Sequence, residues 1–203
     1  MASKIMSGKK YIVGIDEAGR GPLAGPVAVG LVVVEIGFDW NLIPGVGDSK
    51  QVSPKNREAI FRHAKALKKE GKLNYIVVQK TALQIDRKGI AVVIRDAISQ
   101  GLKKLEIEPR NSHILLDGSL KAPEIYKNQK TIIKGDSKEK AIGLASIIAK
   151  VTRDAHMTRI SKKYPKYDFE IHKGYGTEKH RKCIKTHGPI PNIHRFTYIS
   201  RIV

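Results

Sequence analysis

The sequence contains one cysteine and no long hydrophobic run. Cys183 by itself can form neither an intrachain disulfide nor a thiolate metal site, so a reducing compartment suits the chain. No apolar run approaches the roughly 20 residues that a membrane-spanning helix needs. The first ten residues are polar and basic and lack the apolar segment of a signal peptide. These absences predict a cytoplasmic protein that does not insert into a membrane.

Acidic residues are also scarce. The chain has 19 Asp and Glu against 38 Lys and Arg, which gives a formal net charge of +19 and a pI near 10.0. Such an excess indicates a polyanionic partner, and nucleic acid is the favoured one. A lysine coat that only improves solubility is the main alternative. An anionic membrane surface is less favoured, because no expected helix pairs a continuous basic face with a large aromatic one.

The sequence does contain the pattern of a folded α/β protein. With 203 residues, 41% of them hydrophobic, the chain is long enough for one domain with a proper core. The apolar runs predict strands at 11–15, 27–34, 73–79, 113–116 and 131–134. Periodicity and capping residues predict helices at 54–69, 86–104, 138–163 and 178–186, the last with Thr177 as its N-cap. This arrangement of strands and helices favours the α/β class.

Two adjacent carboxylates follow the first apolar run. Asp16 and Glu17 are poor core residues, because a buried charge needs a partner, and a divalent cation is a suitable one. The turn Gly19-Arg20-Gly21 comes next in the chain. Its glycines have no Cβ, so a ligand can approach the main chain closely, and the arginine can hold a phosphate. The stretch therefore combines a candidate metal site with a candidate site for phosphate or sugar.

Three of the expected strands end at or just before an aspartate. Ligands gather at the carboxyl ends of strands in an open α/β sheet, so the acids that follow these strands are expected to converge; they are Asp16, Glu17, Asp117 and Asp136. Each also has an ordinary reading, since Asp117-Gly118 can form a turn and Asp136 can cap the next helix. Together, four carboxylates would repel one another and a nucleic-acid phosphate unless divalent cations lay between them.

Carboxylate oxygens favour Mg²⁺ or Mn²⁺ over softer metals. Two such ions a few ångströms apart can activate a water and stabilise the leaving oxygen of a phosphodiester. The seven histidines show no metal-ligand spacing, and His172, His180 and His187 are expected to face phosphate or solvent instead. The residues therefore predict a metal-dependent phosphodiesterase site made of carboxylates.

Five separate motifs resemble those of bacterial ribonuclease HII, the type 2 ribonuclease H family, and occur in the family's order. They are GIDEAGRGP at 14–22, LLDG at 115–118, KGDS at 134–137, ASIIAKVTRD at 145–154 and HKGYGT at 172–177. The resemblance covers about residues 11–187. It implies the ribonuclease H-like fold, a mixed central sheet flanked by helices with a C-terminal helical extension. We expect a single catalytic domain with an α/β core at about 11–160 and a basic extension at about 161–203.

The resemblance also implies an activity. The family hydrolyses the RNA strand of RNA/DNA hybrids. It also incises 5′ of single ribonucleotides embedded in duplex DNA, a step of ribonucleotide excision repair, and leaves a 3′-OH and a 5′-phosphate. The implied partners are therefore an RNA/DNA hybrid and a DNA duplex that contains ribonucleotides. We expect a monomer, and residues 190–203 show no clear sliding-clamp motif.

The resemblance gives each motif a role. The implied catalytic residues, which are also the ligands of two Mn²⁺ or Mg²⁺ ions, are Asp16, Glu17, Asp117 and Asp136. Gly19, Arg20 and Gly21 would read the 2′-OH through main-chain groups. Tyr175 would pack on the deoxyribose that follows the ribonucleotide, and Lys50 would lie near a substrate phosphate. Asp154 maps to a supporting position, and its ordinary partner is a Lys or Arg one helical turn away.

Two alternatives to this activity stay open at the level of the sequence. A type 3 ribonuclease H shares the fold, but it lacks the Gly-Arg-Gly signature and carries an extra N-terminal substrate-binding domain. A non-catalytic basic module that binds nucleic acid would explain the charge. Four carboxylates argue against such a module, because uncompensated acids would weaken its affinity for phosphate.

Overall fold

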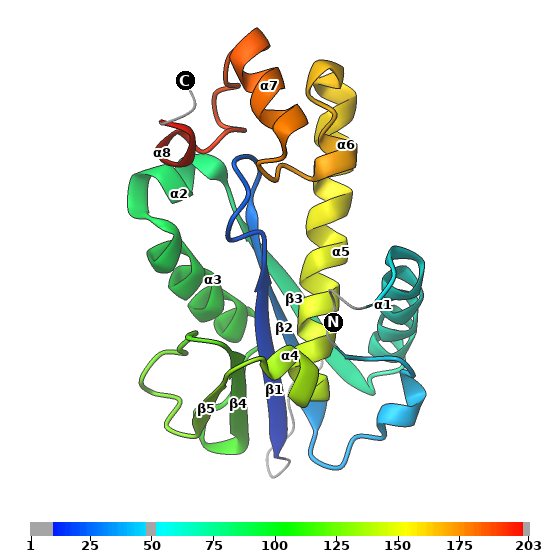
Figure 1. Ribbon diagram of the computed structural model, residues 1–203. Coiled ribbons are helices and arrows are strands. Elements are labelled where there is room, and N and C mark those ends of the chain that lie inside the picture. Colours follow the sequence, from blue (N-terminus) through cyan, green and yellow to red (C-terminus); the bar gives the residue numbers. More distant parts are fainter. Residues whose placement is uncertain (1–9, 48–51, 201–203) are drawn as a thin grey trace.

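The computed structural model describes residues 10–47 and 52–200 and has a five-stranded mixed sheet at its centre (Figure 1). The strand order is β3-β2-β1-β4-β5. The strands are β1 (Tyr11–Ala18), β2 (Val27–Glu35), β3 (Leu73–Lys80), β4 (Ser112–Asp117) and β5 (Gln129–Ile132). Strand β2 is antiparallel to both β1 and β3, while β4 is parallel to β1 and to β5. The predicted α/β class is therefore confirmed.

Helices cover both faces of the sheet (Figure 1). On one face lie α1 (Pro54–Lys69), the short α4 (Gly135–Lys138) and the long α5 (Lys140–Lys163). On the other lie α2 (Ala82–Lys88) and α3 (Ile90–Lys104). Strand β2 is buried along almost its whole length because both faces are covered, which explains its valine-rich composition.

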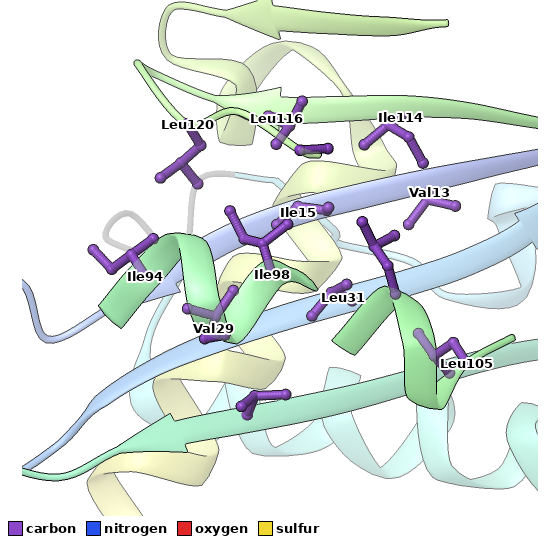
Figure 2. Packing of buried hydrophobic residues seen from close by; sticks show 14 of the residues in the cluster. Val13, Ile15, Val29, Leu31, Ile94, Ile98, Leu105, Ile114, Leu116 and Leu120 are labelled. Carbon is purple, nitrogen blue, oxygen red and sulfur yellow. The ribbon is translucent and has the colours of Figure 1, made fainter. Parts of the chain in front are cut away.

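The larger hydrophobic core lies between the sheet and α3. Figure 2 shows Ile94 and Ile98 of α3 directed at the strands that carry Ile15 and Leu31. All four side chains are fully buried or nearly so. A second core joins α1 and α5 to the opposite face of the sheet. The two cores fix β1 between them.

Helix α5 packs against the sheet at very short range. A Cβ on Gly14 of β1 would lie 2.2 Å from the backbone of Ala141, and a Cβ on Gly30 of β2 would lie 2.4 Å from the carbonyl oxygen of Ala145. The glycines of the strands and the small residues of α5 therefore allow the helix backbone to contact the sheet directly. This contact brings the first half of α5 beside the end of β1.

Several element boundaries differ from the predicted ones. The helix expected at 86–104 is two helices, because Gly89 adopts φ 80° and ψ 151° and ends α2 before α3 begins. The helix expected from 138 begins at Lys140, since Glu139 is extended and separates α4 from α5. Strand β5 ends at Ile132 rather than 134, where Lys134 turns the chain through a left-handed conformation. Helix α1 has the predicted bounds, with Ser53 as its N-cap.

The C-terminal part consists of short helices: α6 (Phe169–His172), α7 (Glu178–His187) and α8 (Phe196–Ile199). The remaining single turns are η1 (Trp40–Leu42), η2 (Pro109–Asn111) and η3 (Pro165–Tyr167). The predicted cap of α7 is confirmed, because Thr177 Oγ1 accepts a hydrogen bond from the His180 amide at 3.3 Å. Within the described residues, no helix has the length and apolar character needed to cross a membrane.

Candidate active site

One cleft gathers the predicted carboxylates. Asp16 and Glu17 come from β1, Asp117 is the last residue of β4, and Asp136 belongs to α4. Ile15 pairs with Leu116 in the parallel ladder, so Asp16 and Asp117, which follow them, lie at the same level of the sheet. The cleft has a volume of about 250 Å³. Its lining residues are Asp16, Glu17, Ala18, Gly19, Arg20, Gly21, Arg57, Asp117, Asp136, Ser146, Lys150 and Tyr175.

Asp16 is the most deeply placed of these acids, at 5% exposure. Its Oδ1 accepts a hydrogen bond from the Glu17 amide at 2.7 Å, and its side chain also bonds Ser146 of α5. Burial raises the pKa of Asp16 to about 8, and the negative charges of Glu17 and Asp117 act in the same direction. The two hydrogen bonds only partly offset this shift.

Glu17 has a partner from the glycine turn. Burial raises the pKa of Glu17, while the guanidinium of Arg20, 3.2 Å from Glu17 Oε1, lowers it in part. Arg20 itself is about half exposed, so this ion pair is screened by solvent. The site thus contains two neighbouring acids whose charged forms are disfavoured in the absence of further positive charge.

Asp117 connects β4 to α4. Its Oδ1 accepts a hydrogen bond from the Gly135 amide at 2.6 Å, which fixes the start of the segment that carries Asp136. A Cβ on Gly135 would lie 2.6 Å from Ile142 Cδ1 and 3.3 Å from Asp117 Oδ1, so a larger residue there would displace the Ile142 side chain. Asp136 follows at 8% exposure. Asp136 therefore reaches the cleft from a helical turn after β5 and not from the strand end itself.

The donor set suits a hard divalent cation, because it consists of carboxylate oxygens. Within residues 10–47 and 52–200, however, no three His, Cys, Asp or Glu side chains lie close enough together to share one ion. Two of the acids turn to local donors instead: Asp16 to the Glu17 amide and Asp117 to the Gly135 amide. The chemistry of the residues fits a metal site, because the four carboxylates line one cleft.

The turn Gly19-Arg20-Gly21 forms one wall of the cleft. Gly19 has φ 93°, and a Cβ there would lie 2.1 Å from Arg153 Nε, so this glycine is required by the fold. A Cβ on Gly21 would meet nothing within 4 Å. Gly21 therefore leaves open space beside the cleft, which is the property that close approach of a ligand to the main chain requires.

Tyr175 also lines the cleft and is 42% exposed. Its ring centroid is 5.6 Å from Lys150 Nζ and 5.7 Å from Arg153 Cζ. Its backbone carbonyl receives a hydrogen bond of 2.9 Å from His180 Nδ1, assigned as the donor because a carbonyl can only accept. A rigid backbone thus presents an exposed aromatic ring beside basic side chains.

The histidine prediction is wrong for two of the three residues. His172 is 7% exposed and His180 is fully buried, whereas His187 is exposed as expected. The buried rings stack at a centroid distance of 4.2 Å, and His172 Nδ1 accepts from the Gly174 amide at 3.1 Å. They hold the loop of Tyr175 and do not face phosphate. Their burial comes from packing on Phe169 and, for His180, on His194, which spacing alone could not reveal.

Sequence reasoning missed three polar residues of the cleft. Ser146 and Lys150 are one helical turn apart on α5, so the motif at 145–154 did contain a signal for a shared face. Arg57 comes from α1 and carried no such signal. The partner predicted for Asp154 is confirmed, because Lys150 Nζ lies 3.0 Å from Asp154 Oδ1. Lys50 lies outside the described residues.

Solved structures with similar architecture define the class of protein. Ribonuclease H2 from Pyrococcus horikoshii OT3 is 29% identical with a TM-score of 0.74, over 95% of this chain and 96% of that one. Bst-RNase HIII in complex with Mn²⁺ is 20% identical with a TM-score of 0.69, over 94% of this chain and 67% of that one, a likeness that shows the fold alone. The chain has the ribonuclease H-like fold.

The family follows from the sequence comparisons. Residues 13–201 match the family model described as Ribonuclease HII. Ribonuclease HII from Caldicellulosiruptor bescii is 42% identical over 97% of this chain and 90% of its own length. The chain belongs to the ribonuclease HII family, and it is an endoribonuclease that hydrolyses the RNA strand of RNA/DNA hybrids. This result decides against both the type 3 enzyme and the non-catalytic module.

Proposed function

We propose that this endoribonuclease also incises duplex DNA 5′ of a single embedded ribonucleotide and leaves a 3′-OH and a 5′-phosphate. One observation carries the proposal: the Gly19-Arg20-Gly21 turn and Tyr175 line the same cleft as the four carboxylates. A site for reading one sugar therefore lies directly beside a site for cutting the adjacent phosphodiester.

Asp16, Glu17, Asp117 and Asp136 would hold two divalent ions, Mg²⁺ or Mn²⁺. When bound, such ions supply an activated water and stabilise the charge on the leaving oxygen. The raised pKa values of Asp16 and Glu17 support this assignment, because nearby positive charge would favour the ionised forms that ligate metal.

Basic side chains around the carboxylates would hold the substrate backbone. Arg57 and Lys150 line the same cleft as the acids, and so does Arg20, whose side chain is about half exposed. A guanidinium can bind a phosphate with two parallel hydrogen bonds, which fixes its orientation. Lys50, which the sequence resemblance places near a phosphate, remains part of the proposal.

Recognition of the ribonucleotide would rest on its 2′-OH, which both donates and accepts hydrogen bonds. Main-chain groups of the glycine turn are available for this contact because Gly21 leaves room for close approach. The ring of Tyr175 would pack on the next deoxyribose while its hydroxyl supports the 2′-OH contact. A second 2′-OH on that next sugar would disturb the packing, which gives a physical reason for preferring an RNA-to-DNA junction.

The test is cleavage of a labelled DNA duplex that contains one ribonucleotide, with Mg²⁺ or Mn²⁺ and with a chelator. We expect a single metal-dependent cut 5′ of the ribonucleotide, with 3′-OH and 5′-phosphate ends. An all-DNA duplex of the same sequence is the control and should remain intact. If the enzyme cuts a long RNA/DNA hybrid under the same conditions but not this duplex, the proposal is wrong.

A further inference from the structure

Arg195 is a fully buried arginine with three backbone carbonyls as its hydrogen-bond acceptors. Its Nη2 donates to Gly19 O at 2.7 Å, its Nη1 to Arg20 O at 2.9 Å and its Nε to Gly25 O at 3.0 Å. Two of these carbonyls belong to the glycine turn that lines the active-site cleft. Arg195, although far from β1 in sequence, thus holds the Gly19-Arg20-Gly21 turn by hydrogen bonds.

The direction of these carbonyls determines the direction of two amides. In a planar trans peptide the C=O of one residue and the N–H of the next point to opposite sides. Since the Gly19 and Arg20 carbonyls point at Arg195, the amides of Arg20 and Gly21 point away from it. Within residues 10–47 and 52–200, neither amide donates to a protein acceptor. Two donors in the cleft wall are therefore held ready for an external acceptor.

The guanidinium is itself fixed by its surroundings. The Arg195 amide donates to Leu23 O at 2.8 Å, and the Gly25 amide donates to Ile193 O at 2.8 Å, so the C-terminal segment pairs with the same loop. The Tyr198 hydroxyl donates to Arg20 O at 3.3 Å, and its ring centroid lies 5.2 Å from Arg195 Cζ.

A carboxylate on α2 anchors the short helix that follows Arg195. Asp86 accepts hydrogen bonds from the Phe196 amide at 2.9 Å, the Thr197 amide at 3.0 Å and the Thr197 hydroxyl at 2.6 Å. Asp86 thereby connects α8 to the body of the molecule. The position of Arg195 is set by the fold on both of its sides.

Burial lowers the pKa of Arg195 to about 10, with the charge of Arg153 acting in the same direction. Within residues 10–47 and 52–200 Arg195 forms no salt bridge, and its hydrogen bonds go to neutral carbonyls, so its buried charge is costly to the fold. An apolar side chain in its place would leave three carbonyls without this donor, so the arginine holds the turn in its conformation.

We propose that Arg195, supported by Tyr198, is a positioning residue for ribose recognition: by holding the Gly19 and Arg20 carbonyls it aims the Arg20 and Gly21 amides at the 2′-oxygen of the substrate. This inference rests on the proposed function of the glycine turn. Lysine cannot replace the arginine, because one ammonium group cannot reach three carbonyls that are bound by three separate guanidinium nitrogens.

The test compares binding of two labelled duplexes, one all-DNA and one with a single ribonucleotide, with Ca²⁺ in place of Mg²⁺ or Mn²⁺ and far below the melting temperature. The quantity measured is the ratio of the two dissociation constants. We expect Arg195→Lys to reduce the wild-type preference for the ribonucleotide about tenfold, the value of one to two hydrogen bonds, with little change in affinity for all-DNA duplex. Tyr198→Phe should reduce the preference by a smaller factor.

Tyr167→Phe is the matched control, because its hydroxyl bonds the carbonyls of His187 and Gly188, outside the glycine turn. An unchanged ratio in both Arg195→Lys and Tyr198→Phe would overturn the inference, as would an equal fall in Tyr167→Phe. If Arg195→Lys does not fold, Tyr198→Phe against Tyr167→Phe decides the matter. A wild-type enzyme that binds both duplexes equally would instead overturn the proposed recognition of the 2′-OH itself.

Discussion

At the scale of the residue, the site is defined by acids whose charged forms are disfavoured by burial unless a cation lies nearby. Asp16 is buried beside Glu17 and Asp117, and its pKa is raised to about 8. A structural acid in such a position would normally have a cationic partner, as Asp154 has in Lys150. The contrast between these two aspartates separates a candidate metal ligand from a helix-stabilising residue.

Asp16→Asn should abolish turnover while leaving duplex binding intact or tighter at low metal concentration. The change removes a proposed ligand and a negative charge together, and asparagine keeps the shape of the side chain. Single-turnover cleavage and equilibrium binding on the same hybrid measure the two effects separately. Retained activity would contradict the assignment of the four carboxylates.

A pair of buried histidines makes stability depend on acid. Burial lowers the pKa of both His180 and His194 to about 4, and their Nε2 atoms lie 3.2 Å apart. Between pH 6.5 and 4 the unfolded chain binds more protons at these rings than the folded chain does. Their contribution to stability is therefore full above pH 6.5 and is lost as the pH falls toward 4.

We expect His194→Gln to lower the free energy of unfolding at pH 7.5, with the deficit shrinking toward pH 4.5 by on the order of 3 kcal/mol. Asp16 opposes the trend in both proteins because of its raised pKa, so the difference between variant and wild type is the informative quantity. Urea unfolding at several pH values gives it. The exposed His63 supplies a control variant, His63→Gln, and a deficit that is independent of pH would refute the explanation.

At the scale of the element, the close contact of α5 with the sheet places the site. Gly14 lets the backbone of Ala141 approach β1, and Ser146 one turn further along α5 bonds Asp16. The same helix then supplies Lys150 to the cleft. A shift of α5 would move both of these cleft residues at once.

Gly14→Ala should destabilise the fold by about 1–3 kcal/mol or more, because the new methyl would lie 2.2 Å from the Ala141 backbone. Gly21→Ala is the matched control, since its methyl meets nothing, and its stability should stay within about 0.5 kcal/mol of wild type. Urea midpoints measure both. Equal stability of the two variants would show that α5 can retreat from the sheet at little cost.

Local signals in the sequence predicted most helices and strands but not the breaks between consecutive helices. Helix α1 followed from its Ser53-Pro54 start, and the strands followed from apolar runs. The break at Gly89 was missed because apolar residues continue on both sides of it, at Ile85 and Ile90. The hydrogen bond from Arg195 to Gly19 O joins segments far apart in sequence, and no local pattern encodes it. The burial of His180 depends on packing of its ring against Phe169 and His194, which residue spacing does not reveal.

At the scale of the whole molecule, a strongly basic chain surrounds an acidic cleft. The formal charge of +19 attracts the phosphate backbone, while four carboxylates mark the place where the backbone would be cut. Segments that lie far apart in sequence contact one another beside this cleft. The Leu23 amide, just after the glycine turn, donates to Gly174 O at 2.8 Å, and Arg195 donates to Gly19 O at 2.7 Å.

Binding to a duplex should weaken steeply with salt, because cations on the protein release counterions from the phosphates. We expect the logarithm of the association constant to fall linearly with the logarithm of salt concentration, with a slope that decreases in magnitude by about 1 when Arg57→Gln removes one cation from the cleft. Fluorescence anisotropy at salt concentrations from about 50 to 200 mM measures this slope. A binding constant independent of salt would contradict an electrostatic interface.

We propose that Tyr175 helps the enzyme to select an isolated ribonucleotide, whereas the carboxylates in the same cleft cut any bound hybrid. The most direct measurement is kcat/KM of Tyr175→Ala and wild type on two substrates, a DNA duplex with one ribonucleotide and a long RNA/DNA hybrid. We predict a loss on the single-ribonucleotide duplex about tenfold greater than on the hybrid, because aromatic packing against a nucleotide contributes roughly 1–3 kcal/mol. Equal losses on the two substrates would contradict the account and leave Tyr175 with a packing role alone.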